Sequence, residues 1–147
     1  MNGCLVDSNV LSELRKAKRC DAGVRQWFEE TAAEELFISV LVLGEIRKGI
    51  ERIRPRDPAK ARALEKWLLG IAAEFPDRLL PVDDEVADQW ARLGLQKSVP
   101  ILDAFLAATA RVHNLTIVSR DEEGFRNAGV RVINPFSKSE PKGKAVR

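Results

Sequence analysis

Short apolar runs alternate along this chain with longer segments whose apolar residues recur every three or four positions. Buried strands are predicted by the runs at 3–6, 36–38 and 115–118, with further short strands at 79–82 and 130–133. The helical spacing predicts helices at 10–14, 22–33, 40–52, 59–75, 86–95 and 101–113. Because short strands alternate with helices, the pattern predicts an α/β fold with a central parallel β-sheet flanked by helices.

The length of 147 residues fits one domain, which we place at residues 1–136, with a mobile C-terminal tail over 137–147. No apolar run approaches the ~20 residues of a membrane-spanning helix, so no membrane partner is expected. The N-terminus lacks the basic and apolar regions of a secretory signal. Two cysteines, Cys4 and Cys20, make no disulfide framework, and a reducing, cytoplasmic setting is the simplest expectation.

The net charge of +2 excludes a protein that binds nucleic acid through bulk positive charge. Residues 137–147 hold four basic residues and one acid, so the remaining chain has a net charge of −1. Residues 47–66 are a local exception, with eight basic residues and three acids. Two interpretations stay open for this segment: a solvated helical hairpin, or RNA contact, for which Arg47 and Lys48 are the best candidates.

Four acidic residues stand where the pattern predicts convergent or buried positions. Asp7 and Asp121 follow the predicted strands at 3–6 and 115–118, and parallel strands bring their carboxyl ends to one edge of a sheet. Glu45 and Asp103 interrupt apolar helical faces, where an acid needs a partner. Two carboxylates 4 Å apart repel by roughly 4 kcal/mol at an effective dielectric of ~20. Mg²⁺ or Mn²⁺ would offset that repulsion and could support phosphodiester hydrolysis.

Each acid also has other interpretations. Asp7 can cap a helix, Asp103 can interact with a helix dipole, and Asp121 can be a loop acid or a helix cap. Glu45 has no equally simple structural explanation. A phosphotransferase or phosphatase with Asp7 as nucleophile is a further alternative, although a haloacid-dehalogenase-like site needs an acid where Asn9 stands.

The motifs around these acids resemble those of the PIN-domain ribonucleases, specifically the VapC/FitB-type toxins of bacterial toxin–antitoxin pairs. The resemblance spans residues 3–136 and rests on the ordered motifs LVDSNV (5–10), LGEIRKG (43–49), LPVD (80–83), LDAFLAA (102–108), TIVSRD (116–121) and VINPF (132–136). Ser8 and Ser119 replace the family's more common Thr and keep the hydroxyl. Asp121 stands where many relatives have Asn, and Gly124 replaces a common acid.

The resemblance implies a PIN domain with Mg²⁺-dependent endoribonuclease activity, for which Mn²⁺ would be a substitute. It implies a catalytic set of Asp7, Glu45, Asp103 and Asp121, with Asp7 and Asp103 as metal ligands and with Ser8, Asn9 and Ser119 as site support. The implied partners are an RNA substrate, a cognate antitoxin, a second copy in a homodimer, and a toxin–antitoxin hetero-oligomer. The alternative is a catalytically inactive PIN module that acts through protein or RNA binding.

Overall fold

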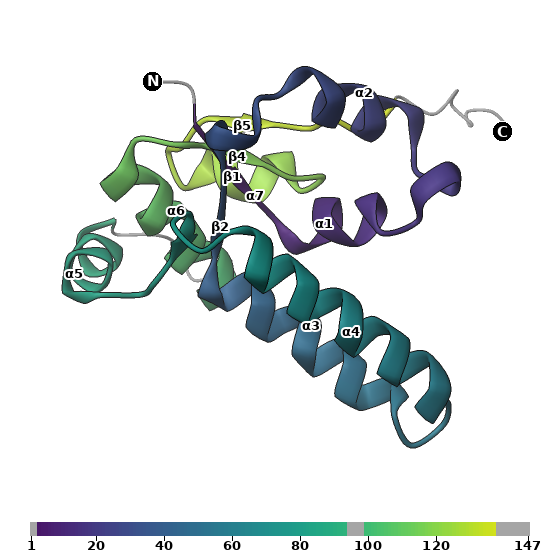
Figure 1. Cartoon of the computed structure of the whole chain (residues 1–147). Coiled ribbons are helices and arrows are strands. Elements are labelled where there is room, and N and C mark those ends of the chain that lie inside the picture. Colours follow the sequence, from purple (N-terminus) through teal and green to yellow (C-terminus); the bar gives the residue numbers. More distant parts are fainter. Residues whose placement is uncertain (1–2, 94–98, 138–147) are drawn as a thin grey trace, which may run out of the picture.

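Five short parallel strands form the centre of the computed structural model, which describes residues 3–93 and 99–137 (Figure 1). The strands are β1 (Cys4–Val6), β2 (Leu36–Ser39), β3 (Leu79–Leu80), β4 (Thr116–Val118) and β5 (Val132–Ile133). Their order in the sheet is β3-β2-β1-β4-β5, and each neighbouring pair is parallel. The predicted α/β fold with a parallel sheet is therefore confirmed, and the carboxyl ends of β1 and β4 are neighbours.

Helices connect the strands, as parallel pairing requires. They are α1 (Ser8–Leu14), α2 (Ala22–Glu30), α3 (Val40–Ile53), α4 (Pro58–Glu74), α5 (Asp84–Arg92), α6 (Ile101–His113) and α7 (Glu122–Asn127). Figure 1 shows α3 and α4 as a long antiparallel hairpin that extends away from the sheet, while α5 and α6 lie together on another side. No helix in the described part of the chain is long and apolar enough to cross a membrane.

Most of these helices begin at a side chain that accepts a backbone hydrogen bond. The capping residues are Asp7, Asp21, Ser39, Asp57, Asp83 and Asp121. Such caps satisfy N–H groups that have no partner within the helix. Asp7 and Asp121 therefore do serve as helix caps, and these roles fix where their carboxylates lie.

The core lies around the central strands. All of β1 is buried, and Leu5, Ile38 and Ile117 are almost completely shielded from solvent on three adjacent strands. Burying each such side chain stabilises the fold by about 1.5–3 kcal/mol. Against β4 packs α6, whose small buried residues, such as Ala107 and Ala108, permit a close approach. This packing makes the edge that carries Asp7 a rigid platform.

Several predicted boundaries were too long. The helix predicted at 22–33 ends at Glu30, because Thr31 is extended and its hydroxyl donates to the Trp27 carbonyl. The strand predicted at 79–82 is only Leu79–Leu80, since Pro81 has no N–H to donate.

Two other predictions fall partly outside the described residues. The predicted helix 86–95 begins earlier, at Asp84, and its last two residues are not among those described. Of the predicted tail, 138–147 also lies outside them. Ser137 is described, and its N–H and hydroxyl both donate to the Asp21 carboxylate.

Candidate active site

The Asp7 carboxylate is fixed at the carboxyl end of β1. The side chain is buried, its Oδ1 accepts the Ser8 N–H at 2.8 Å, and its Oδ2 accepts the Ser119 hydroxyl at 2.7 Å. The Asp7 N–H donates to the Val118 carbonyl of β4 at 3.0 Å. Two neighbouring strands thus hold this carboxylate, and each oxygen keeps a lone pair for a further ligand.

Ser119 connects the acids through its buried hydroxyl. Besides donating to Asp7, Ser119 Oγ accepts the Asn9 Nδ2–H at 3.3 Å and the Asp121 N–H at 3.0 Å. Asn9 Oδ1 in turn accepts the Arg120 N–H at 3.1 Å. The structure therefore brings the predicted support residues Asn9 and Ser119 together with two of the predicted acids.

Glu45 reaches the same place from α3. The Ser8 hydroxyl donates to Glu45 Oε1 at 3.3 Å, which joins α3 to the start of α1. Burial raises the pKa of Glu45, and the charge of Asp7 raises it further. Burial also raises the pKa of Asp7, although the hydrogen bonds from Ser119 and Ser8 oppose that effect. The Ser8 hydroxyl is therefore the hydrogen-bond partner of the acid that interrupts the apolar stripe, while the charge of Asp7 opposes its ionisation.

Asp103 completes the group from the first turn of α6. Its pKa is raised to about 6, first by burial and then by the nearby charges of Asp7, Asp121 and Glu45. If Asp103 interacted only with the dipole of α6, three other carboxylates would not raise its pKa. The four acids predicted from the sequence therefore converge, although they come from four separate segments of the chain.

No basic partner offsets these charges. Within residues 3–93 and 99–137, no Lys or Arg makes an ion pair with any of the four acids. In the same residues, no three His, Cys, Asp or Glu side chains already stand in a metal-holding arrangement. The donors are all carboxylate oxygens, which suit Mg²⁺, an ion that keeps several waters and needs few protein ligands. The residues fit such an ion in chemistry.

Asp121 has its place because residue 124 is glycine. Asp121 Oδ1 accepts the Gly124 N–H at 3.2 Å, which starts α7. A Cβ at position 124 would lie 2.8 Å from Asp121 Oδ2 and would displace the carboxylate. The sequence showed this glycine only as a departure from the family pattern. In the structure, it leaves space for the fourth acid.

Beside the acids lies a hollow of about 330 Å³ between α1, α3 and α4, which sequence reasoning missed. Its lining includes Ser8 and Glu45 of the site, together with Arg15 and Trp67. Trp67 also borders an apolar groove of about 380 Å³ between α1, α2 and α4. The segments that line these hollows are distant in sequence, so no local sequence pattern predicts either hollow.

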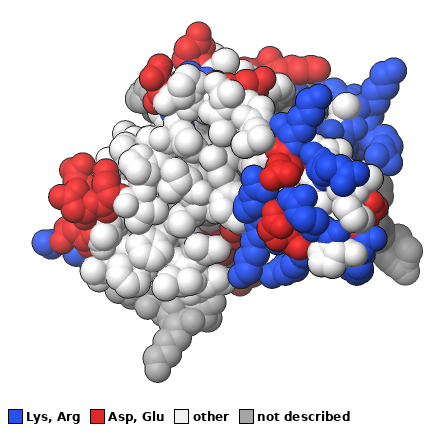
Figure 2. All heavy atoms as spheres, turned by 60° about the horizontal axis from the view of Figure 1, so that its bottom comes forward, with Lys and Arg blue, Asp and Glu red and all other residues white. Residues whose placement is uncertain are grey.

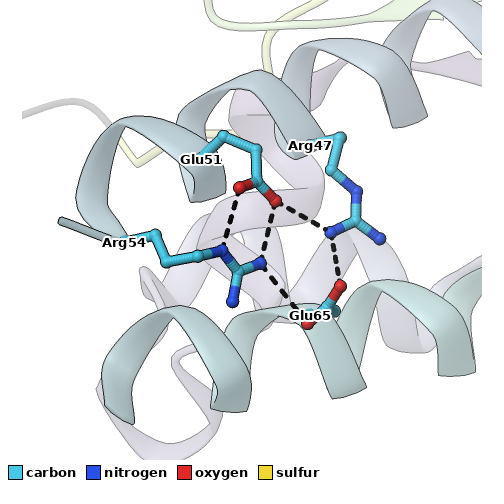
Figure 3. Close-up of polar contacts among 4 residues, drawn as sticks. All are labelled: Arg47, Glu51, Arg54 and Glu65. Atoms are coloured by element: carbon cyan, nitrogen blue, oxygen red, sulfur yellow. Dashed lines mark hydrogen bonds and ion pairs between the residues drawn. The ribbon is translucent and has the colours of Figure 1, made fainter. Parts of the chain in front are cut away.

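The basic segment at 47–66 forms most of the α3–α4 hairpin, and an ion-pair network binds its two helices together (Figure 3). Arg47 Nη1 lies 2.7 Å from Glu65 Oε2 and 3.2 Å from Glu51 Oε2. Arg54 contacts Glu51 through two nitrogens and reaches Glu65 at 3.4 Å. The guanidinium of Arg47 is therefore engaged within the hairpin. RNA contact by Arg47, and by the exposed Lys48, stays a prediction.

The chain is similar to known proteins over most of its length. Residues 4–130 match the family described as PIN domain. The plasmid stability protein StbB of Pseudomonas syringae pv. tomato is 35% identical over 140 residues, which cover 90% of this chain and 97% of that protein. The toxin FitB of Neisseria gonorrhoeae is 30% identical over 138 residues, covering 90% and 97%.

One further relative and one solved structure agree with these matches. The VapC ribonuclease Y4jK of Sinorhizobium fredii is 31% identical over 140 residues, covering 90% of this chain and 96% of that protein. The crystal structure of FitAcB from Neisseria gonorrhoeae has a TM-score of 0.80 at 30% identity, and covers 90% of this chain and 97% of that one.

Proposed function

Because the chain belongs to the PIN-domain family, we propose that it is a metal-dependent endoribonuclease and the toxin of a toxin–antitoxin pair. One observation carries the proposal: four carboxylates converge at the carboxyl edge of the sheet without a basic partner in the described part of the chain, and their charges help to raise the pKa of Asp103 to about 6. An uncompensated acidic cluster is costly unless a cation binds it. The relatives named as a toxin and as a ribonuclease support the same activity.

Asp7 and Asp103 would hold Mg²⁺, with Mn²⁺ as a substitute, and Glu45 would contribute directly or through water. When bound, such an ion lowers the pKa of a water and offsets the charge of the phosphate. Asp121 would orient the attacking water or support a second ion. The Asp121 N–H donates to the Ser119 hydroxyl, and that hydroxyl donates to Asp7. One hydroxyl would therefore position both the acid that orients the water, Asp121, and the acid that binds the ion, Asp7.

The hydroxyls of Ser8 and Ser119 have a definite task in this mechanism. Each donates to a carboxylate that would otherwise rotate: Ser119 to Asp7 and Ser8 to Glu45. Partners of this kind orient ligands and are worth roughly 10–100-fold in metal affinity or activity when lost. The two serines thus keep the carboxylates preorganised while repulsion drives them apart.

A cognate antitoxin is the proposed protein partner. The FitAcB crystal structure and a FitAB structure bound to a DNA fragment support such a complex. We expect an antitoxin segment to lie across the acidic cleft, meaning the four acids and the hollow beside them. It would continue into the apolar groove, because Trp67 lines both the hollow and the groove. The apolar groove would supply most of the binding energy of such a segment, because apolar, largely preformed grooves favour ligand binding.

The proposed homodimer would use the uncharged face shown in Figure 2, which is bounded on one side by acidic side chains and on the other by Lys and Arg. A two-fold axis lying in that face places the acidic side of one copy against the basic side of the other. Light scattering during size-exclusion chromatography should give about twice the chain mass of 16.4 kDa. A monomer at micromolar concentration would contradict the homodimer.

The proposed activity is tested by incubating antitoxin-free protein with single-stranded RNA and Mg²⁺ or Mn²⁺. We expect cleavage that EDTA abolishes, that added metal restores, and that Asp7→Asn prevents. RNA binding without cleavage on any substrate would favour the inactive-module alternative. A phosphorylated Asp7 would favour the phosphotransferase alternative.

A further inference from the structure

Arg120 belongs to the candidate site through its backbone. It directly follows Ser119, which donates to Asp7, and its own N–H donates to Asn9 Oδ1. These two contacts fix the backbone on the N-terminal side of Arg120, and the Asp121 N–H, which donates to Ser119 Oγ, fixes it on the other side. The position of Arg120 relative to Asp7 is therefore as rigid as the sheet edge itself.

The side chain of Arg120 is also held in place. Its guanidinium carbon lies 3.9 Å from the centroid of the Phe136 ring, a stacked cation–π contact. The Phe136 N–H donates to Asn134 Oδ1 at 3.0 Å, and the next residue, Ser137, donates its N–H to Asp21 Oδ2 at 2.9 Å. Because the chain is anchored on both sides of Phe136, the ring is a fixed support for the cation.

Arg120 has no ion-pair partner in the described part of the chain. No carboxylate in the described ranges lies within ion-pair distance of its guanidinium, whereas Arg47 and Arg54 are both paired. Arg120 is exposed to solvent. A planar guanidinium held by stacking, with its donors free, is well suited to bidentate contact with a phosphate.

Arg120 also lies at the correct edge of the sheet. Because β4 and β5 are parallel, Arg120 after β4 and Phe136 after β5 stand at the same carboxyl edge as Asp7. A polyanion approaching four carboxylates is repelled, and one metal site offsets the charge of one phosphate only. The phosphates on either side need a cation supplied by the protein.

We propose that Arg120, held flat by Phe136, binds a phosphate of the RNA substrate next to the one that is cleaved. This inference rests on the ribonuclease function proposed above. It makes Arg120 a substrate-binding residue and Phe136 a positioning residue. It also provides a phosphate contact at the site itself, separate from the basic residues of the hairpin.

The first test compares Arg120→Ala with Arg131→Ala. Arg131 is a matched control: it is exposed, its side chain donates to the Thr116 hydroxyl at 3.2 Å, and it stands before β5 at the opposite edge of the sheet. For Arg120→Ala we expect the KM for RNA to rise about 5- to 20-fold while kcat stays within about twofold. Arg131→Ala should leave both parameters near wild type. Equal effects of the two substitutions would overturn the proposal.

The second test measures RNA binding in EDTA by fluorescence anisotropy as a function of salt. Losing one phosphate contact to single-stranded RNA should reduce the slope of log K against log salt by about 0.7. An unchanged slope for Arg120→Ala would overturn the proposal. Arg120→Lys should recover the slope but only part of the affinity, because lysine keeps the charge without the planar stack.

The third test addresses Phe136 with a double-mutant cycle. Phe136→Leu should raise KM severalfold in the wild-type background and have no effect on KM when Arg120 is already Ala. Phe136→Tyr keeps the ring and should retain wild-type KM. If Phe136→Leu changes KM equally in both backgrounds, Phe136 does not act through Arg120.

These outcomes separate the two proposals. If the wild-type protein cleaves RNA and Arg120→Ala leaves KM unchanged, the phosphate assignment fails and the ribonuclease function stands. If the wild type cleaves no RNA but Arg120→Ala still reduces the salt slope of RNA binding, the ribonuclease function fails and the phosphate contact stands.

Discussion

The α3–α4 hairpin and the acidic edge of the sheet differ in whether their charged side chains have partners of opposite charge. In the hairpin, Arg47, Glu51, Arg54 and Glu65 pair with one another across two helices (Figure 3). At the sheet edge, four acids converge with no basic partner in the described part of the chain. Paired charges add modestly to stability at an exposed position, whereas unpaired, partly buried charges reduce it. From this difference we infer that the paired hairpin charges stabilise the fold, and we propose that the edge charges bind a ligand.

The two regions should therefore respond oppositely to acid. Hydrogen bonds from Arg54 hold the pKa of Glu51 at about 2, so its favourable contribution exists above its ordinary pKa and is lost as pH falls toward 2. The pKa of Asp103 is raised to about 6, so its carboxyl costs the fold nothing at low pH. Its unfavourable contribution develops as pH rises from about 4 through 6.

The largest expected effect comes from Asp7→Asn, which removes one carboxylate charge from the edge. RNA cleavage should fall by about 10³-fold or more, since metal-assisted charge stabilisation is worth several kcal/mol. The matched control is Asp83→Asn, because the Asp83 carboxylate also caps a helix, where it accepts the Val86 N–H at 3.0 Å. Cleavage by Asp83→Asn should be unchanged. Near-equal losses in both variants would mean that Asp7 acts only as a cap.

A smaller loss is expected from Ser119→Ala, which leaves all four acids in place. Without the 2.7 Å hydrogen bond to Asp7, the carboxylate is less well oriented, and kcat/KM should fall about 10- to 100-fold. Ser119→Thr keeps the hydroxyl and should retain most of the activity. Wild-type kcat/KM in Ser119→Ala would show that the hydroxyl has no part in the site.

Asp103→Asn should make the metal-free protein more stable, although it removes a site residue. Relief of the desolvation of the Asp103 charge, and of its repulsion by the other acids, is together worth on the order of 1 kcal/mol after allowance for solvent screening, or about 2–4 °C in Tm for a chain of this size. The gain should be largest near pH 7 in EDTA and should shrink below pH 5, where the wild-type carboxyl is already protonated. Differential scanning calorimetry at both pH values measures this. A loss of stability at pH 7 contradicts the repulsion.

The smallest effect is expected from Glu65→Gln in the hairpin. Both Arg47 and Arg54 lose a charged partner, so Tm should fall slightly in low salt. The fall should disappear in 1 M NaCl, where screening acts over about 3 Å. Because the hairpin charges serve the fold, kcat/KM should stay within about twofold of wild type. A large loss of activity would remove the distinction between the two regions.

What the sequence could predict depended on whether a signal was local. The strand before Asp7 and the acid within the α3 stripe are visible in a few residues, because burial leaves a periodic pattern. The contact between Arg47 and Glu65 depends on how two helices pack, so the sequence left both a helical hairpin and RNA contact open for the basic segment. The stack of Arg120 on Phe136 depends on two neighbouring strand ends. Such contacts form only when segments distant in sequence meet in the fold, so the residue types alone do not predict them.

Titration of the antitoxin-free protein with Mn²⁺ in a calorimeter shows directly whether the unpaired acids bind a divalent cation. We expect saturable binding to the wild type, binding weakened at least about tenfold in Asp103→Asn, and wild-type binding in Asp83→Asn. Absence of saturable binding to the folded wild type, or equal affinity in Asp103→Asn, would rule out a metal site at these acids.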